Sequence, residues 1–151
     1  MIEVAATLLD VNVLLALAWP NHIHHEAAHR WFRAVRSLGW ATCALTQAAF
    51  VRLSAQPEVV KTTLAVSDAI RTLQANVSTA EHEFWPLEYG ITQILPEIRE
   101  RVMGRHQVTD ALLLDLTIRR GGKLATFDRR IESLLASGSA HRAALEILPA
   151  E

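Results

Sequence analysis

The sequence has little cysteine, no long hydrophobic run and almost no net charge, and each of these features excludes a class of protein. The single cysteine, Cys43, rules out an internal disulfide and indicates a reducing compartment. No apolar run is long enough to cross a membrane, and no basic segment precedes a signal-type core at the N-terminus. We therefore expect a cytoplasmic protein that does not interact with a membrane.

The net charge of -1 excludes nucleic-acid binding driven by a positive charge spread over the whole protein. It still allows a local basic rim, because arginines are concentrated in the second half of the chain: Arg99, Arg101, Arg105, Arg119, Arg120, Arg129 and Arg130. Arg119 lies four residues after Asp115, a helical spacing that predicts an exposed ion pair contributing well under about 1 kcal/mol.

Half of the residues are hydrophobic, so a chain of 151 residues can bury a core as a single domain spanning residues 1–151. The apolar patterns predict strands at 7–11, 40–45, 82–87, 123–127 and 145–148. They predict helices at 12–19, 25–38, from Thr46 to about 53, at 62–74, 91–102, 109–120 and 130–136. This alternation predicts an α/β fold, a three-layer α/β/α sandwich with a central, mostly parallel sheet.

Residues 106–129 contain one acid at the start of a predicted helix and another at the end of a predicted strand. Asp110 follows the potential N-cap Thr109 and falls in the first turn of a predicted helix, where the helix dipole favours negative charge. Gly121 and Gly122 end that helix, and the next strand delivers Asp128 to its carboxyl end. Ligands of open parallel sheets bind at those carboxyl ends. The two carboxylates are therefore expected to share one crevice.

A third acid, Asp10, repeats this construction at the end of the first predicted strand. Asp10, Asp110 and Asp128 in one crevice would repel each other unless a cation joined them. A set of oxygen ligands suits Mg²⁺ or Mn²⁺. The spacing therefore predicts a divalent metal site.

The segment HEAAH at 25–29 offers a competing interpretation. His25 and His29 are one helical turn apart with Glu26 between them, which matches the zinc-protease pattern HExxH. No third ligand follows at a usual spacing, and Glu26 also suits the helix dipole. A solvated helix start is the favoured interpretation, with a zinc site as the alternative.

Four segments together resemble the PIN-domain toxins called VapC. They are LLDVNVLLAL with Asp10, LTQAAFVRLS around Gln47, VTDALLLDL with Asp110 and LATFDR with Asp128, and HEFWP at 82–86 resembles a segment of one branch. The resemblance extends over residues 8–130. It implies a PIN-like sandwich and a metal-dependent endoribonuclease of a type II toxin–antitoxin pair, usually dimeric and silenced by a VapB-type antitoxin.

The resemblance also assigns roles. Asp10 and Asp110 would be the principal ligands of Mg²⁺ or Mn²⁺, and Asp128 would bind directly or through water. Gln47 replaces the family's second acid, so it can ligate through its carbonyl oxygen but supplies no negative charge.

Supporting roles are expected for three further residues. Asn12 and Thr126 would orient the acids, and Arg129 would hold the RNA backbone. Because Gln47 removes a charge, a PIN fold that binds RNA or a partner with little catalysis remains the alternative.

Overall fold

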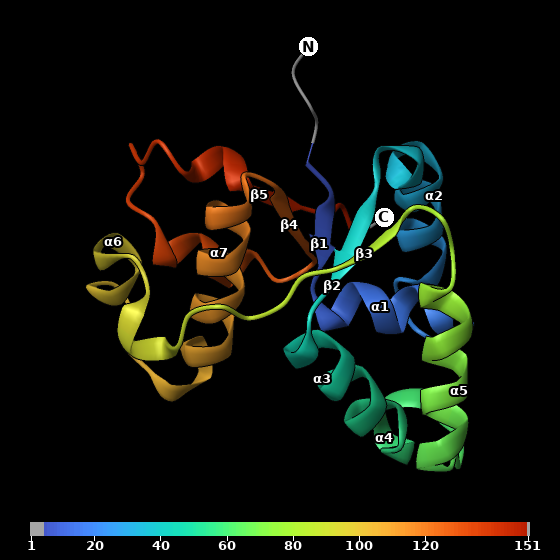
Figure 1. The fold of residues 1–151 in the computed structure, drawn as a ribbon. Helices are drawn as coiled ribbons and strands as arrows, with labels where there is room; N and C mark the ends of the chain where they lie inside the picture. Colours follow the sequence, from blue (N-terminus) through green and yellow to red (C-terminus); the bar gives the residue numbers. More distant parts are fainter. Residues whose placement is uncertain (1–4, 151) are drawn as a thin grey trace.

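The computed structural model describes residues 5–150 and has a five-stranded sheet at its centre (Figure 1). All neighbouring strands are parallel, and their order across the sheet is β3-β2-β1-β4-β5. The strands are β1 (Thr7–Leu9), β2 (Trp40–Thr42), β3 (His82–Phe84), β4 (Lys123–Thr126) and β5 (Leu145–Ile147). The predicted α/β fold with a parallel sheet is confirmed, and residues 82–84 form the expected edge strand.

Helices cover both faces of the sheet, which gives three layers (Figure 1). The α-helices are α1 (Val11–Ala18), α2 (His25–Val35), α3 (Ala44–Ser54), α4 (Pro57–Val60), α5 (Val66–Val77), α6 (Pro96–Arg99) and α7 (Val108–Arg120). Short 3-10 helices are η1 (Arg36–Leu38), η2 (Ile91–Gln93), η3 (Arg105–Gln107), η4 (Arg129–Leu134) and η5 (Arg142–Ala144). Within residues 5–150, none of these helices has the length and apolar character of a membrane span.

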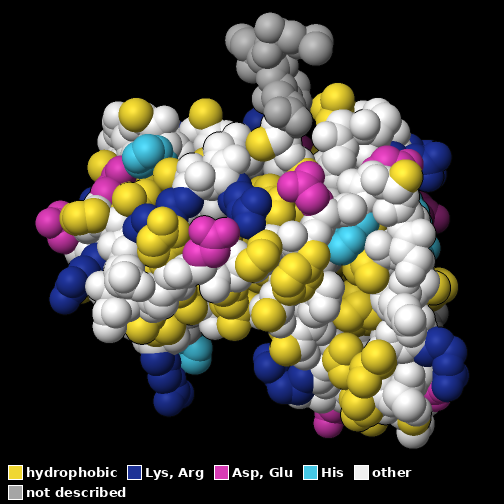
Figure 2. Space-filling view, in the orientation of Figure 1, with side chains coloured by type: hydrophobic (Ala, Val, Ile, Leu, Met, Phe, Trp, Pro, Cys, Tyr) yellow, Lys and Arg dark blue, Asp and Glu magenta, His cyan; other side chains and the backbone are white. Residues whose placement is uncertain are grey.

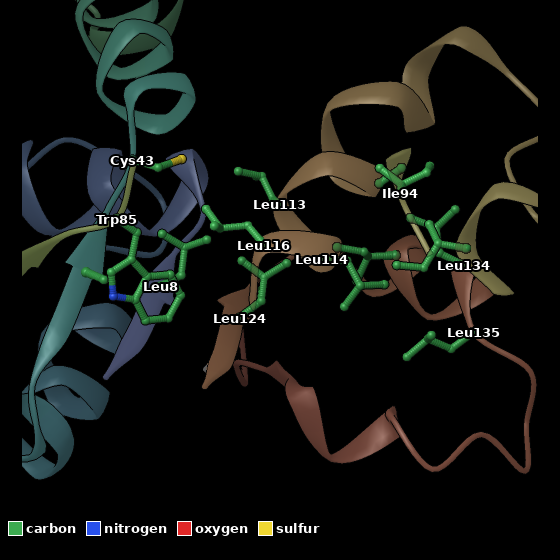
Figure 3. Close-up of a cluster of buried hydrophobic side chains, with 14 of the residues drawn as sticks. Leu8, Cys43, Trp85, Ile94, Leu113, Leu114, Leu116, Leu124, Leu134 and Leu135 are labelled. Carbon is green, nitrogen blue, oxygen red and sulfur yellow. The ribbon is translucent and has the colours of Figure 1, made fainter. Parts of the chain in front are cut away.

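Each face of the sheet contributes to a separate hydrophobic core, because successive strand residues point to opposite faces. Leu8 of β1 and Leu124 of β4 pack with Leu113 and Leu114 of α7 (Figure 3). Leu9 of β1 instead belongs to the cluster formed with α1, α3 and α5. The two cores fix α1 and α7 on opposite faces of the same central strands.

The glycine turn between α7 and β4 is required by backbone geometry. Gly121 ends the helix with a φ of 69°, a left-handed conformation that glycine adopts without strain. A side chain at Gly122 would lie 2.5 Å from the backbone oxygen of Ala6 and 2.8 Å from the ring of Trp85. This close approach lets α7 pack directly against the central strands.

Two helix starts differ from the predicted ones. β2 ends at Thr42, and α3 begins at Ala44 with Cys43 as its N-cap, so Thr46 is not the cap. The hydroxyl of Thr46 instead accepts from the Cys43 backbone N–H at 3.0 Å. Helix α7 follows directly on a 3-10 turn and begins before Thr109, which is therefore not its cap.

Prolines begin two short helices that were not predicted as separate elements. Pro57 begins α4, and the residue after this helix, Lys61, has a left-handed conformation. The next helix begins at Val66 rather than at residue 62. The helix predicted at 91–102 is wrong as one element, because Pro96 begins a separate short helix, α6. Proline suits the first helical turn because its missing N–H would have no helical partner there.

Candidate functional site

The candidate site lies where the order of strands reverses. From central β1 the chain proceeds to β2 and β3 on one side, then returns to β4 and β5 on the other. The crevice beyond the carboxyl ends of β1 and β4 is therefore the topological switch point, the usual ligand position in such sheets. Asp10 directly follows β1, and Asp128 follows β4 by two residues.

Asp10 is held in place by hydrogen bonds to both of its carboxylate oxygens. It is the N-cap of α1, and its Oδ1 accepts from the Val11 N–H at 2.7 Å. Its Oδ2 accepts from the hydroxyl of Thr126 at 2.8 Å. The residue is only 6% exposed, and this burial raises the pKa of Asp10 although both hydrogen bonds oppose the rise. Each oxygen keeps a lone pair for a further partner.

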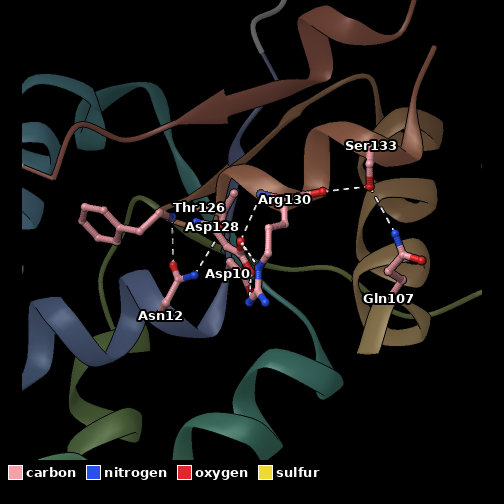
Figure 4. A network of polar contacts seen from close by, with 8 residues as sticks. Asp10, Asn12, Gln107, Thr126, Asp128, Arg130 and Ser133 are labelled. Atoms are coloured by element: carbon pink, nitrogen blue, oxygen red, sulfur yellow. Dashed lines mark hydrogen bonds and ion pairs between the residues drawn. The ribbon is translucent and has the colours of Figure 1, made fainter. Parts of the chain in front are cut away.

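Thr126 and Asn12 connect the ends of the two strands (Figure 4). The fully buried Thr126 hydroxyl donates its proton to Asp10 and accepts from the side-chain amide of Asn12 and from the Asp128 N–H, both at 3.0 Å. Asn12 Oδ1 in turn accepts from the Phe127 N–H at 3.2 Å. The two predicted supporting residues thus make contacts that orient Asp10, although their functional role stays a prediction.

Asp110 lies in the first turn of α7, close enough to Asp10 and Asp128 that their charges affect its pKa. Burial raises the pKa of Asp110 to about 6, and the charges of Asp10 and Asp128 add to the rise, whereas Arg130 opposes it. Among residues 5–150, no hydrogen bond stabilises the charged form of the Asp110 carboxylate. The structure therefore brings the three predicted aspartates close to one another. Burial makes ionisation unfavourable at two of them, Asp10 and Asp110.

Asp128 is bound by an arginine that the sequence analysis did not select. Arg130 donates from Nε to Oδ1 and from Nη2 to Oδ2, both at 2.9 Å, and its backbone N–H donates to Oδ1 (Figure 4). The side-chain bonds with Arg130 hold the pKa of Asp128 below its usual range. The predicted RNA-binding residue, Arg129, points elsewhere and pairs with Glu132 at 2.9 Å. The only sequence signal for Arg130 was its place in the basic rim.

Gln47, on α3, is fixed by neighbours other than the aspartates. Its Nε2 donates to the hydroxyl of Thr42 at 2.9 Å, and this hydroxyl lies 2.7 Å from Nε2 of His82. The Thr42 hydroxyl has one proton and two lone pairs, so it can donate to a neutral His82 ring while it accepts from Gln47. Burial lowers the pKa of His82, in agreement with that arrangement. The contact between Thr42 of β2 and His82 of β3 has no local signal in the sequence.

The chemistry of the acids fits a divalent cation, with one obstacle. All three offer carboxylate oxygens, the ligands that Mg²⁺ and Mn²⁺ prefer, and a cation would relieve the repulsion at Asp110. Among the described residues, however, no three acidic, histidine or cysteine side chains are arranged closely enough to hold a metal ion. Asp128 has turned both oxygens toward Arg130. Asp10 and Asp110, in contrast, have no hydrogen bond to a charged side chain among the described residues.

The histidines of HEAAH have a structural role in the fold. His25 Nδ1 lies 2.7 Å from the backbone oxygen of Ala16, and His29 Nε2 lies 2.8 Å from that of Leu17. These carbonyls belong to the last turn of α1 and have no partner within that helix. The two rings therefore cap α1, which explains their spacing, and the absence of catalytic zinc here stays a prediction.

Asp115 is one turn and a half beyond Asp110 on α7 but lies outside the site. The predicted ion pair with Arg119 is present, but its predicted exposure is wrong, because Asp115 is only 2% exposed. Its Oδ2 accepts from Arg119 Nε and its Oδ1 from the Leu95 N–H, both at 2.9 Å. The carboxylate thereby attaches the segment before α6 to α7.

Comparison with known proteins agrees with this geometry. The sequence pattern of the PIN domain matches residues 7–134. Ribonuclease VapC39 of Mycobacterium tuberculosis (strain H37Rv) is 43% identical over 87% of the chain and 94% of its own length. The chain belongs to the VapC family of PIN-domain proteins. The resemblance found in the four sequence segments is confirmed.

Other members of the family show the same extent of similarity. Ribonuclease VapC38 of the same organism is 45% identical over 84% of this VapC chain and 88% of its own length. Among solved structures, VapBC2 from Rickettsia felis bound to a DNA fragment from its promoter contains a chain with a TM-score of 0.60. That match covers 95% of this chain and 99% of the other at 14% identity, so it supports the fold alone.

Proposed function

We propose that this VapC-family protein is an endoribonuclease that hydrolyses RNA phosphodiester bonds with Mg²⁺ or Mn²⁺, as the toxin of a type II toxin–antitoxin pair. One observation carries the proposal: Asp10, Asp110 and Asp128 meet at the switch point of the sheet, close enough that the other two raise the pKa of Asp110. The family relationship to proteins named as ribonucleases supports the same activity.

Asp10 and Asp110 are the principal metal ligands in this proposal, and Asp128 binds directly or through water. When bound, a divalent cation lowers the pKa of a water molecule and offsets negative charge developing at the phosphate. Thr126 orients Asp10 by donating to its Oδ2, and Asn12 in turn donates to the Thr126 hydroxyl. Preorganised ligands need no rearrangement when the cation arrives.

RNA is held by a few local arginines in this proposal. Figure 2 shows positive and negative side chains interspersed over the face in view, with no large area of one sign. Arg129 is exposed beside Asp128 and can donate charge-assisted hydrogen bonds to a phosphate. Such contacts position the RNA without identifying its sequence.

The proposed partners are a VapB-type antitoxin and a second copy of the chain. The membership of this chain in the VapC family supports an antitoxin partner. An antitoxin would silence the ribonuclease by covering the site, and the pair is proposed to act in the cytoplasm. Co-purification with the antitoxin, followed by loss of cleavage, tests the pairing.

The experiment for the proposed activity compares three aspartate variants. Asp10→Asn and Asp110→Asn should weaken Mn²⁺ binding and lower the rate of RNA cleavage by about a hundredfold or more, because each removes a ligand charge. Asp68→Asn is the matched control, since Asp68 also lies in the first turn of a helix, α5, but pairs with Arg71. Calorimetry with Mn²⁺ and gel analysis of cleaved RNA measure both effects. Equal activity in Asp68→Asn and Asp110→Asn would refute the assignment.

A second function, RNA or partner binding with little catalysis, is favoured by Gln47. Its amide is engaged by Thr42, and it contributes no negative charge to the metal. Under this alternative the protein would bind Mn²⁺ and RNA but leave every RNA intact. Cleavage that requires Asp110 would exclude it.

A further inference from the structure

Arg130 donates a hydrogen bond to each carboxylate oxygen of Asp128. The guanidinium donates to one oxygen from Nε and to the other from Nη2, and the Arg130 N–H adds a third bond to Oδ1. This two-pronged arrangement is the strong geometry for arginine and carboxylate, and it turns both oxygens toward the arginine. Asp128 thus differs from Asp10, whose partners are uncharged and leave it available to a cation.

The charge of Arg130 also reaches the rest of the cluster. Its guanidinium opposes the rise of the pKa of Asp110, so it offsets part of the repulsion among the three acids. Asp110, in turn, favours the charged form of Arg130. Within this group of four residues Arg130 has the electrostatic effect of a bound cation.

We propose that Arg130 is an internal counterion that competes with the divalent metal for Asp128. In the metal-free protein Arg130 neutralises Asp128, and metal binding requires Asp128 to exchange this arginine for the cation. The proposal rests on the proposed metal-dependent activity and identifies Arg130 as a positioning residue for it. Asp128 is the ligand that changes partner, whereas Asp10 keeps its hydrogen bonds throughout.

The exchange is feasible because the arginine is almost entirely in solvent. The side chain of Arg130 is 89% exposed, so it can leave Asp128 without opening the core. Exposed ion pairs of this kind change an equilibrium constant by about fivefold at most. A divalent cation held by three carboxylates can displace such a pair, but the metal affinity is lowered by the factor that the pair contributes.

Arg129 provides a matched control. It is the neighbouring residue, carries the same charge and is 76% exposed, but it pairs with Glu132 and makes no bond to Asp128. Loss of either arginine removes one positive charge near the acids. Only loss of Arg130 frees the Asp128 oxygens, so the difference between the two variants measures the competition itself.

The test is calorimetric titration of metal-free protein with Mn²⁺ at pH 7, comparing Arg130→Gln with Arg129→Gln. Arg130→Gln should bind Mn²⁺ about two- to fivefold more tightly than Arg129→Gln. Arg130→Lys should fall between Arg130→Gln and the unaltered protein, since lysine makes a point contact instead of a fork. In EDTA, Arg130→Gln should also have the lower thermal unfolding midpoint of the two glutamine variants.

Equal or weaker Mn²⁺ binding in Arg130→Gln than in Arg129→Gln would overturn the proposal. Asp10→Asn separates this failure from failure of the proposed function. If the unaltered protein binds Mn²⁺ and Asp10→Asn does not, the metal site stands whatever Arg130 does. Absence of Mn²⁺ binding in the unaltered protein and in every arginine variant would overturn both proposals.

Discussion

The two sides of the site are held in different ways. On the strand side, Asp10, Asn12 and Thr126 form a buried network in which both Asp10 oxygens accept hydrogen bonds. On the helix side, Asp110 is placed by its position in α7, and burial and like charges raise its pKa to about 6. On the strand side, hydrogen bonds offset part of the cost of burying the ionised Asp10, whereas on the helix side no hydrogen bond among the described residues offsets that cost at Asp110. Substitutions on the two sides should therefore have opposite effects on the metal-free protein.

The largest effect is expected on the strand side. Thr126→Val should lower the free energy of unfolding by about 2 to 4 kcal/mol, because it removes one hydrogen bond each from the Asp10 carboxylate, the Asn12 amide and the Asp128 N–H. Thr117→Val is the control, since the equally buried Thr117 hydroxyl makes one bond, to the Leu113 carbonyl, and its loss should cost about 1 kcal/mol or less. Urea unfolding measures both, and equal losses would show that the network adds nothing.

On the helix side, Asp110→Asn should stabilise the metal-free protein. The folded pKa of about 6 lies above the unfolded value of about 3.9, so ionisation of Asp110 disfavours folding. This penalty is absent below about pH 4, grows as pH rises to about 6 and is constant above. After solvent screening of this partly exposed group, removal should gain about 1 to 2 kcal/mol at pH 8 and nothing at pH 3.5. Unfolding curves in EDTA across this range measure the gain.

Asp128→Asn sharpens the same comparison, because the pKa of Asp128 is lowered in the folded protein by Arg130. Its ionised form therefore adds stability above the unfolded pKa, and this contribution is lost as pH falls. The Asn variant should be less stable than the parent at pH 8 and equal to it at low pH. A stability gain in Asp128→Asn at pH 8 would contradict the pairing with Arg130.

Gln47→Glu asks whether α3 belongs to the metal site. A fourth carboxylate about 4 Å from the cation should tighten Mn²⁺ binding by about tenfold, which is about 1.4 kcal/mol. Coulomb's law gives ~4 kcal/mol at that distance and a dielectric near 20, but desolvation of the new carboxylate opposes the gain. The variant also loses the donor to Thr42, which should cost about 1 kcal/mol of stability. Exposed Gln74→Glu is the charge control. Unchanged affinity by calorimetry would place Gln47 outside the site.

The smallest effect is expected from Arg129→Gln on RNA binding. Loss of one phosphate contact should weaken binding about two- to fivefold and reduce the slope of log K against log salt by about 0.7. Arg71→Gln is a close control, because Arg71 is 75% exposed and also pairs with an acid three residues away, at 3.1 Å. Fluorescence anisotropy in EDTA, which prevents cleavage, measures both. Identical slopes would remove Arg129 from the RNA contact.

Sequence reasoning reached the parallel sheet and the convergence of Asp10, Asp110 and Asp128, because apolar periodicity and strand-end acids are local signals. It did not predict the pairing of Arg130 with Asp128, since which of two adjacent arginines returns to Asp128 depends on the turn after β4. It also placed Asp115 at the surface, because the backbone that covers it comes from twenty residues away. The metal and catalytic roles of the acids stay predictions.

The hydrogen bond between Thr126 and Asp10 joins residues 116 positions apart in the chain. At synthesis rates of about 5 to 20 residues per second, the ribosome needs roughly 6 to 23 seconds to pass from one to the other. During that interval β1 has neither β4 beside it nor the Thr126 hydroxyl to hold Asp10. A chain released before β4 would therefore carry Asp10 but no assembled site, so unfinished copies are harmless to RNA if the proposed activity is correct.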